Sequence, residues 1–176
     1  MDPDVLVEGH LEIVPISHVS SILQSDEETQ VEIERFQSCL RRMYETMGKS
    51  VLFLETAVHF HSRPHAHIEV VPMERGMEPE ASMFFKEAFF SCDEEWAQHR
   101  KVIELSSARP LKRAVPAHFQ YLAAEWGDPA ATSGADKDKS KDKSKSSKAG
   151  SDAAPYGGIV HPVESEGTID TNFCLE

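Results

Sequence analysis

The stretch Pro64-His65-Ala66-His67-Ile68-Glu69-Val70-Val71-Pro72 is the most informative part of this sequence. Side chains alternate between the two faces of a β-strand, so His65, His67 and Glu69 are expected on one face. The apolar side chains between them then occupy the other face. Residues 66–71 are therefore predicted to form a strand with one apolar face and one face that carries chemically active groups.

Two more histidines precede this strand. His59 and His61 would share the face of the later histidines if the chain stayed extended, although Pro64 favours a bend.

Three interpretations of these histidines are open. The first is a metal site, without an accompanying Cys or Asp cluster, whose candidate ligands are His59, His61, His65 and His67. The second is a solvated sheet edge, and the third is a phosphate-handling strand in which one imidazole acts as nucleophile.

A long helix is predicted between two apolar strands. The segment Ser25-Asp26-Glu27-Glu28 has the pattern of a capping box, in which Ser25 caps a helix that runs to Gly48. Apolar residues at three- and four-residue spacing are expected to form its buried stripe: Ile33, Phe36, Leu40, Met43 and Met47. Charged residues are expected outside that stripe: Glu32, Arg35, Arg41 and Arg42.

The remaining apolar runs complete a small α+β domain. Further strands are predicted at residues 11–15, 51–54, 118–126 and 156–163. A second helix is predicted from Pro79, with a packed side formed by Phe84, Phe85, Ala88 and Phe89. A third helix is predicted from a cap at Ser91 through Trp96. The long helix and the strands together predict a sheet with one covered face.

Composition limits the classes of protein that fit. The 176 residues, of which 40% are apolar, are enough for one main core. Cys39, Cys92 and Cys174 have no paired spacing, which is typical of free thiols in a reducing compartment. No apolar run reaches the ~20 residues that span a bilayer, so we expect a soluble intracellular protein without membrane contact. The formal charge of -12 disfavours unspecific binding of nucleic acid.

Residues 129–154 are predicted to be a linker. Six lysines alternate with Asp and Ser in its central part: Lys137, Lys139, Lys141, Lys143, Lys145 and Lys148. Residues 136–151 contain no apolar residue larger than alanine, so this segment cannot offset the entropy of its own ordering. A flexible insertion is the favoured interpretation, and a lysine tether for RNA or nuclear import is the alternative.

Two motifs together resemble the histidine-triad superfamily. The histidine strand is similar to the alternating histidines of that superfamily, and Gly9-His10-Leu11-Glu12-Ile13-Val14-Pro15-Ile16-Ser17-His18-Val19 looks like the motif that precedes them. The similarity is greater to the C-terminal domains of the CwfJ/Cwf-nineteen-like splicing factors, especially the Cwf-nineteen branch. It rests on the order of further segments: Val51-Leu52-Phe53-Leu54-Glu55, Met83-Phe84-Phe85-Lys86-Glu87-Ala88, Asp93-Glu94-Glu95-Trp96 and Ile103-Glu104-Leu105-Ser106.

This resemblance implies an α+β fold with a histidine-triad-like (HIT-like) antiparallel sheet and a long helix packed on one face. Residues 5–110 would form the first CwfJ C-terminal region. Residues 115–176 would be the start of the second region, interrupted by the linker 129–154. The superfamily places one or two strands ahead of the strand at Gly9-His10, so the fold is expected to be N-terminally incomplete.

The resemblance also implies a function in pre-mRNA splicing. The family acts in the nucleus on late spliceosomes and excised intron lariats, so the implied partners are spliceosomal proteins and intron lariat RNA. The lariat debranching enzyme is a further candidate partner, and no cofactor is implied. The alternative within the superfamily is a nucleotide hydrolase or transferase with a histidine nucleophile.

Site roles follow from the same resemblance. His67 takes the position of the nucleophile, and the candidate groups for binding phosphate or RNA are His65, His67, Glu69, His18 and His10. Glu69 stands where the superfamily has its third histidine, and an ionised carboxylate repels phosphate. A raised pKa of Glu69, or a contact that holds an imidazole in one tautomer, would remove this conflict. The glycine-rich turn that catalytic members carry is missing after Glu55, which favours binding over catalysis.

Overall fold

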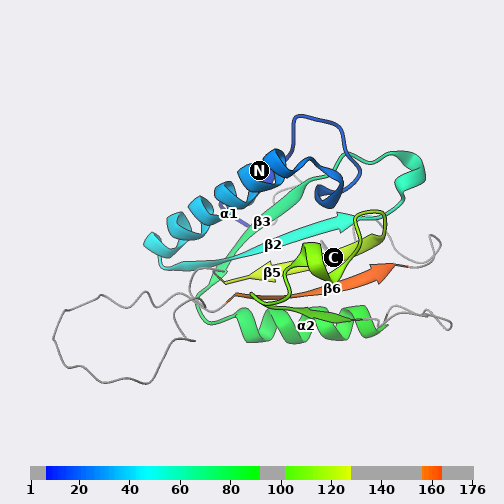
Figure 1. The fold of residues 1–176 in the computed structure, drawn as a ribbon. Coiled ribbons are helices and arrows are strands. Elements are labelled where there is room, and N and C mark those ends of the chain that lie inside the picture. Colours follow the sequence, from blue (N-terminus) through cyan, green and yellow to red (C-terminus); the bar gives the residue numbers. More distant parts are fainter. Residues whose placement is uncertain (1–6, 92–101, 128–155, 164–176) are drawn as a thin grey trace, which may run out of the picture.

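The computed structural model describes residues 7–91, 102–127 and 156–163, which form one six-stranded antiparallel sheet (Figure 1). Its order is β1-β3-β2-β5-β6-β4. The strands are β1 (Leu11–Ile13), β2 (Lys49–Ala57), β3 (Ile68–Glu74), β4 (Ile103–Leu105), β5 (Gln120–Trp126) and β6 (Gly157–Val163). The strand predictions are confirmed, although β3 begins two residues later than expected, so His67 lies just before it.

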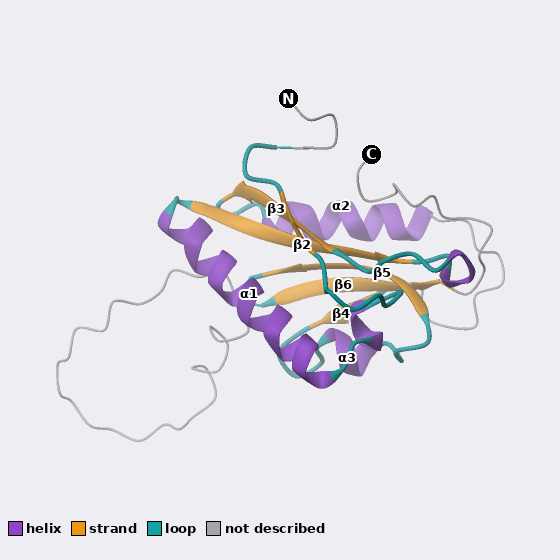
Figure 2. Ribbon diagram, turned by 90° about the horizontal axis from the view of Figure 1, so that it is seen from above, coloured by secondary structure: helices purple, strands orange, loops and turns teal. Residues whose placement is uncertain are grey.

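Helices cover both faces of this sheet (Figures 1 and 2). The helical elements are η1 (Ile22–Gln24), α1 (Glu27–Thr46), η2 (Phe60–Ser62), α2 (Glu78–Ser91) and α3 (Leu111–Ala114). Helix α1 lies on one face and α2 on the other. The α+β class and the long helix packed on one face are therefore confirmed, whereas the expectation of a single covered face is wrong.

Side-chain alternation divides the core into layers. On β2, Val51 and Phe53 face α1 and pack with Ile68 and Val70 of β3. The intervening residues Leu52 and Leu54 face α2, where Phe85 and Phe89 cover them. Phe85 and Phe89 are buried as predicted, but Phe84 is 62% exposed, because it lies on the side of α2 that is turned away from the sheet.

Strands β5 and β6 complete the same sheet as the histidine strand. Pairing of β2 with β5 runs from Leu52 opposite Trp126 to Ala57 opposite Tyr121. Strand β6 then pairs along the whole of β5. The division into regions 5–110 and 115–176 stays a prediction. The segment predicted to be helical after Ser91 and the linker 129–154 lie outside the described residues, except for Ser91 itself.

Helix α1 begins one residue later than the capping-box prediction. Asp26 is the N-cap, and its Oδ1 accepts a hydrogen bond of 2.8 Å from the Thr29 amide. The prediction of Ser25 as the cap is wrong because the aspartate beside it is placed to accept that bond. The helix ends at Thr46, before Gly48, which has a positive φ of 75°. The glycine permits this left-handed turn into β2.

The buried side of α1 is rotated from the predicted stripe. Its buried residues are Ile33, Gln37, Arg41 and Tyr44. Leu40 is partly buried, but Phe36, Met43 and Met47 are 54%, 41% and 62% exposed. The prediction counted only apolar side chains. Long polar side chains are buried instead, since the Arg41 guanidinium lies 4.5 Å from the centre of the Phe53 ring and the Tyr44 hydroxyl donates to the Gly9 carbonyl oxygen at 2.5 Å.

This rotation predicts different costs for two apolar truncations on α1. Ile33→Ala should lower the free energy of unfolding by about 2–4 kcal/mol, because it leaves a cavity beneath the helix. Phe36→Ala should change it by less than about 0.5 kcal/mol, because that ring is largely in solvent. Urea unfolding of both variants measures the difference. Equal losses would mean that the helix is turned as the apolar stripe predicted.

Candidate functional site

Three side chains meet around the carboxylate of Glu69. Glu69 lies on β3, opposite Glu12 of β1. His10 directly precedes β1, and its Nε2 lies 3.5 Å from one Glu69 oxygen. His67 directly precedes β3, and its Nε2 lies 4.0 Å from the other oxygen. The structure thus brings together His10, His67 and Glu69 from the predicted set.

Exposure differs sharply within this cluster. The side chains of His10 and Glu69 are 6% and 8% exposed, whereas that of His67 is 41% exposed. Burial raises the pKa of Glu69; the charges of His67 and His10 act to lower it, and Glu12 acts to raise it. His67 is therefore the group of this cluster that a ligand can reach, and Glu69 is the group behind it that responds to a proton.

Hydrogen bonding restricts the tautomer of His67. Its Nδ1 lies 3.2 Å from the carbonyl oxygen of His65, which can only accept a hydrogen bond, so Nδ1 carries a proton. In the neutral ring Nε2 then has a lone pair that faces Glu69. Such a lone pair is compatible with nucleophilic attack, and it is compatible with the carboxylate when either group holds a proton. Two arrangements would stop Glu69 from repelling phosphate: a protonated carboxyl group, and a contact that holds an imidazole in one tautomer. Both are chemically possible in this geometry.

A second imidazole pair lies next to this cluster. His65 Nε2 donates to the carbonyl oxygen of Pro15 at 2.9 Å, and the rings of His18 and His65 have centroids 4.9 Å apart. The Ala66 amide donates to the carbonyl oxygen of Val19 at 2.8 Å. These contacts hold the segment after β1 against the start of the histidine strand. The pair connects to the Glu69 cluster through the contact between His67 and the His65 carbonyl.

The upstream histidines lie in a turn of different geometry. His59 and Arg63 have left-handed φ values of 55° and 52° at the two ends of η2, so the extended path considered for this segment is wrong. The His59 amide donates to Gln120 Oε1 at 2.6 Å, and the His59 and His61 rings meet edge to face at 5.8 Å. Within the described residues, no group of three or more His, Cys, Asp or Glu is arranged to hold a metal ion.

Sequence reasoning missed a second polar centre on the face that α1 covers. The buried carboxylate of Glu55 accepts hydrogen bonds from the Ile22 amide and the Tyr121 hydroxyl, both at 2.8 Å. Burial raises the pKa of Glu55 to about 7, against the effect of these two donors. Nearby, the Tyr156 hydroxyl donates to Glu125. The available signal was a glutamate in two apolar segments, Glu55 directly after residues 51–54 and Glu125 before Trp126, at positions that face the same side as Phe53.

Fold and site together define a small α+β domain with an accessible histidine–carboxylate cluster at one sheet edge. Residues 1–86 match the family model described as "Protein similar to CwfJ C-terminal". CWF19-like protein 2 of Danio rerio is 39% identical over 124 residues, which cover 69% of this chain and 13% of that protein. Human CWF19-like protein 2 is 34% identical over 122 residues, which cover 69% and 14%.

A further relative is the pre-mRNA-splicing factor cwf19 of Schizosaccharomyces pombe. It is 36% identical over 99 residues, which cover 56% of this chain and 16% of that protein. This chain belongs to the Cwf19-like family. It spans less than a fifth of the length of these three relatives. In the described part of the chain, no helix has the length and apolar character of a membrane span.

The cluster predicts how the pKa of Glu69 responds to loss of either imidazole. Both rings favour the charged carboxylate, so His67→Ala and His10→Ala should each raise the pKa of Glu69. Titration of the 13C-labelled Glu69 carboxyl by NMR measures this. His61→Ala is the control, and a response to His61→Ala as large as to His67→Ala would contradict the arrangement.

Proposed function

We propose that this chain binds RNA phosphate through His65 and His67 as part of a nuclear pre-mRNA splicing factor. The observation that carries the proposal is the accessible His67 ring, which is 41% exposed and is backed by buried Glu69. Because the His65 carbonyl holds Nδ1, Nε2 is the ring nitrogen of His67 that is left for a ligand, beside Glu69, and in the protonated ring it donates to a phosphate oxygen. The printed name of the fission-yeast relative, a pre-mRNA-splicing factor, supports the biological setting.

Glu69 makes this phosphate contact conditional on a proton. An ionised carboxylate ~4 Å from a phosphate oxygen repels it by roughly 1 kcal/mol in water and about 4 kcal/mol at an effective dielectric of 20. Burial raises the pKa of Glu69, which favours the neutral form near the ligand. A proton on Glu69 thus removes the repulsion, and a second proton, on His67 Nε2, supplies the donor.

The net charge argues for affinity shared between RNA and protein. A chain with a formal charge of -12 gains nothing from unspecific attraction to a polyanion, so a few local contacts hold the RNA. Spliceosomal protein partners then supply much of the remaining binding energy. In this proposal the HIT-like domain acts at the late or intron-lariat stage, contacts intron lariat RNA and helps the debranching enzyme.

RNA binding tests the proposal directly. The probes are a labelled branched RNA with a 2′–5′ linkage and a linear RNA of the same sequence, measured by fluorescence anisotropy with the full chain. His67→Ala and His65→Ala should each weaken binding about ten-fold, as expected for loss of a hydrogen bond to a charged group. His61→Ala, in the adjacent turn, is the matched control. Unchanged affinity in both histidine variants would refute phosphate binding at this edge.

The cellular setting needs a separate measurement. The tagged protein, expressed at its native level, should crosslink to excised intron lariats and co-purify with late spliceosomal proteins. If it does neither, the assignment to splicing fails even where RNA binding in solution persists. Phosphate binding and the role in splicing are therefore tested independently.

The tautomer of His67 favours one second candidate, a nucleotide hydrolase or transferase. Nε2 would attack the α-phosphorus of a nucleotide, forming a P–N bond while the bond to the leaving group breaks and that group takes up a proton. Water would then cleave the P–N bond, release the nucleotide and regenerate the imidazole. Hydrogen bonds to the phosphoryl oxygens would stabilise the charge in both steps.

Turnover of adenosine phosphoramidate separates this candidate from simple binding. Under the hydrolase hypothesis the wild-type chain releases AMP, His67→Ala abolishes release because it removes the nucleophile, and His61→Ala leaves the rate unchanged. Chromatography of the nucleotide products measures the rates. Absence of release by the wild type, or an equal rate in His67→Ala, would exclude the hydrolase.

A further inference from the structure

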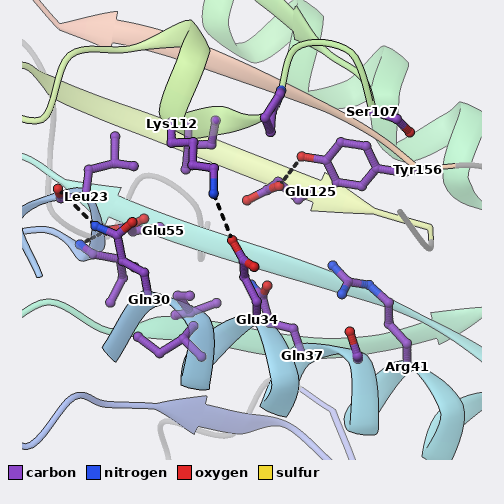
Figure 3. Close-up of a pocket in the computed structure, with 16 residues that line it drawn as sticks. Leu23, Gln30, Glu34, Gln37, Arg41, Glu55, Ser107, Lys112, Glu125 and Tyr156 are labelled. Carbon is purple, nitrogen blue, oxygen red and sulfur yellow. Dashed lines mark hydrogen bonds and ion pairs between the residues drawn. The ribbon is translucent and has the colours of Figure 1, made fainter. Parts of the chain in front are cut away.

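A pocket of about 440 Å³ lies between α1 and the segment that contains α3 (Figure 3). Ile33, Ile68 and Leu111 contribute apolar side chains to its wall. Ile68 lines this pocket, whereas the next residue of β3, Glu69, belongs to the histidine cluster. Because successive side chains of a strand point to opposite faces, the pocket and the histidine site lie on opposite faces of the sheet. A concave site of this volume with convergent polar groups is the usual form of a ligand pocket.

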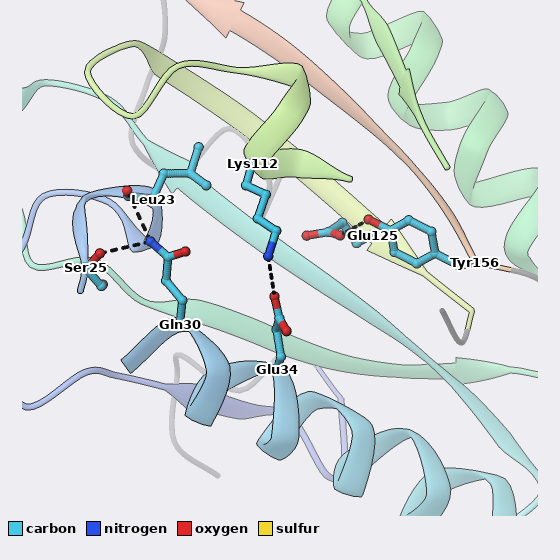
Figure 4. A network of polar contacts seen from close by, with 7 residues as sticks. All are labelled: Leu23, Ser25, Gln30, Glu34, Lys112, Glu125 and Tyr156. Carbon is cyan, nitrogen blue, oxygen red and sulfur yellow. Dashed lines mark hydrogen bonds and ion pairs between the residues drawn. The ribbon is translucent and has the colours of Figure 1, made fainter. Parts of the chain in front are cut away.

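The side-chain amide of Gln37 has unused hydrogen-bonding capacity in this pocket. Gln37 is only 9% exposed, and it lines the cavity from α1 (Figure 3). Within the described residues, no group hydrogen-bonds its amide. Gln30, about two turns earlier on α1, donates instead to the carbonyl oxygens of Leu23 at 3.3 Å and Ser25 at 2.9 Å (Figure 4). The Gln37 side chain lines the cavity, so its amide is available to pair with a ligand there.

Three carboxylates converge on the same pocket. Burial raises the pKa of Glu125, and the charge of Glu34 acts in the same direction, while the Tyr156 hydrogen bond and Arg41 oppose it. Burial is the largest cause of the raised pKa of Glu55, and the charge of Glu125 acts in the same direction. Glu34, Glu55 and Glu125 all line the pocket, and Glu125 is close enough to each of the other two for repulsion when both are ionised. A cation bound among them would relieve this repulsion.

Two basic side chains, Arg41 and Lys112, line the pocket with these three carboxylates, and the charge of Arg41 acts to lower the pKa of Glu125. The guanidinium of Arg41 lies over the Phe53 ring, at 4.5 Å from its centre. Lys112 Nζ lies 3.6 Å from Glu34, across the pocket (Figures 3 and 4). Both members of this pair are more than half exposed, at 58% and 59%, so the pair is weak and an incoming cation can displace Lys112.

We propose that this pocket binds an arginine side chain presented by a partner protein. Its guanidinium would donate to Glu34, Glu125 and the Gln37 carbonyl oxygen. Its aliphatic stem would pack on the wall formed by Ile33, Ile68 and Leu111. A planar group with five donors matches several separated acceptors better than the single ammonium of a lysine does.

Charge complementarity selects a basic protein segment as the occupant. The formal charge of -12 attracts a basic partner and disfavours a phosphate-bearing ligand on this acidic face. The inference does not rest on RNA binding at the histidine edge, because it uses side chains on the other face of the sheet. The two can therefore fail separately.

The test uses the full 15N-labelled chain and a minimal probe, N-acetyl-arginine methylamide, with the neutral citrulline analogue as its matched control. Titration followed by NMR should shift the side-chain amide of Gln37 and the backbone amides of residues 34–41, with a Kd on the order of 1 mM. The citrulline analogue should bind at least about five-fold more weakly, because it keeps the shape but lacks the charge.

Two variants separate binding from folding. Glu34→Gln, at an exposed position, should weaken the arginine probe about five-fold. Gln37→Leu should weaken it as well while preserving stability, because leucine is of similar size and the Ile33 and Ile68 side chains beside it are apolar. Glu28→Gln on the outer side of α1 should leave binding unchanged, and none of the three should alter the affinity for branched RNA.

Three results would each overturn the proposal. The first is equal binding of the arginine and citrulline probes. The second is unchanged arginine binding in both Glu34→Gln and Gln37→Leu. The third is a shift of the pocket resonances by adenosine and not by the arginine probe, which would identify the pocket as a nucleobase site.

Discussion

The register between β2 and β3 is the constraint on which the rest of this structure depends. Phe53 stands opposite Val70, and Leu54 opposite Glu69. This pairing places Val70 beneath α1 and turns Glu69 to the other face, where His10 and His67 approach it. A shift of one residue would exchange the two faces and bury the carboxylate beneath α1. The apolar partners of Phe53 thus fix the position of the chemically active side chains.

Much of the sheet could be predicted from short apolar runs, because a strand that is covered on both faces is apolar at successive positions. The strand at residues 51–54 follows this rule, whereas aromatic residues and alternation predicted the strand at 118–126. The rotation of α1 could not be predicted in this way. Arg41 and Gln37 are polar by residue type, yet their long side chains lie against Phe53 and in the α1 pocket. Whether such a side chain is buried depends on partners from β2, which are far away in the sequence.

The sequence was enough to predict which residues form the site, but not which of their side chains contact one another. His65 and His67 stand out as a pattern, and the motif with His10 and His18 was found through family resemblance. Their division into two contacts, His18 with His65 and His10 with Glu69, depends on how the segment after β1 folds back onto the start of β3. The Pro15 carbonyl and the Val19 carbonyl decide that path by accepting hydrogen bonds from His65 and Ala66. Backbone acceptors of this kind leave no signal in a sequence.

The two faces of the sheet carry complementary electrostatics. One face offers imidazoles, which become positive when they bind a proton, next to the carboxylates of Glu69 and Glu12. The other face holds Glu34, Glu55 and Glu125 beside the Gln37 amide, and burying Glu55, and Glu125 in part, costs free energy. Hydrophobic side chains of similar size would stabilise the domain more, so a purely structural role does not account for them. A ligand that compensates their charge and pairs with the amide does account for them, because their cost is then recovered on binding. With an anion at the histidine edge and a cation in the pocket, one thin sheet could hold RNA and protein at the same time without bringing their charges into competition.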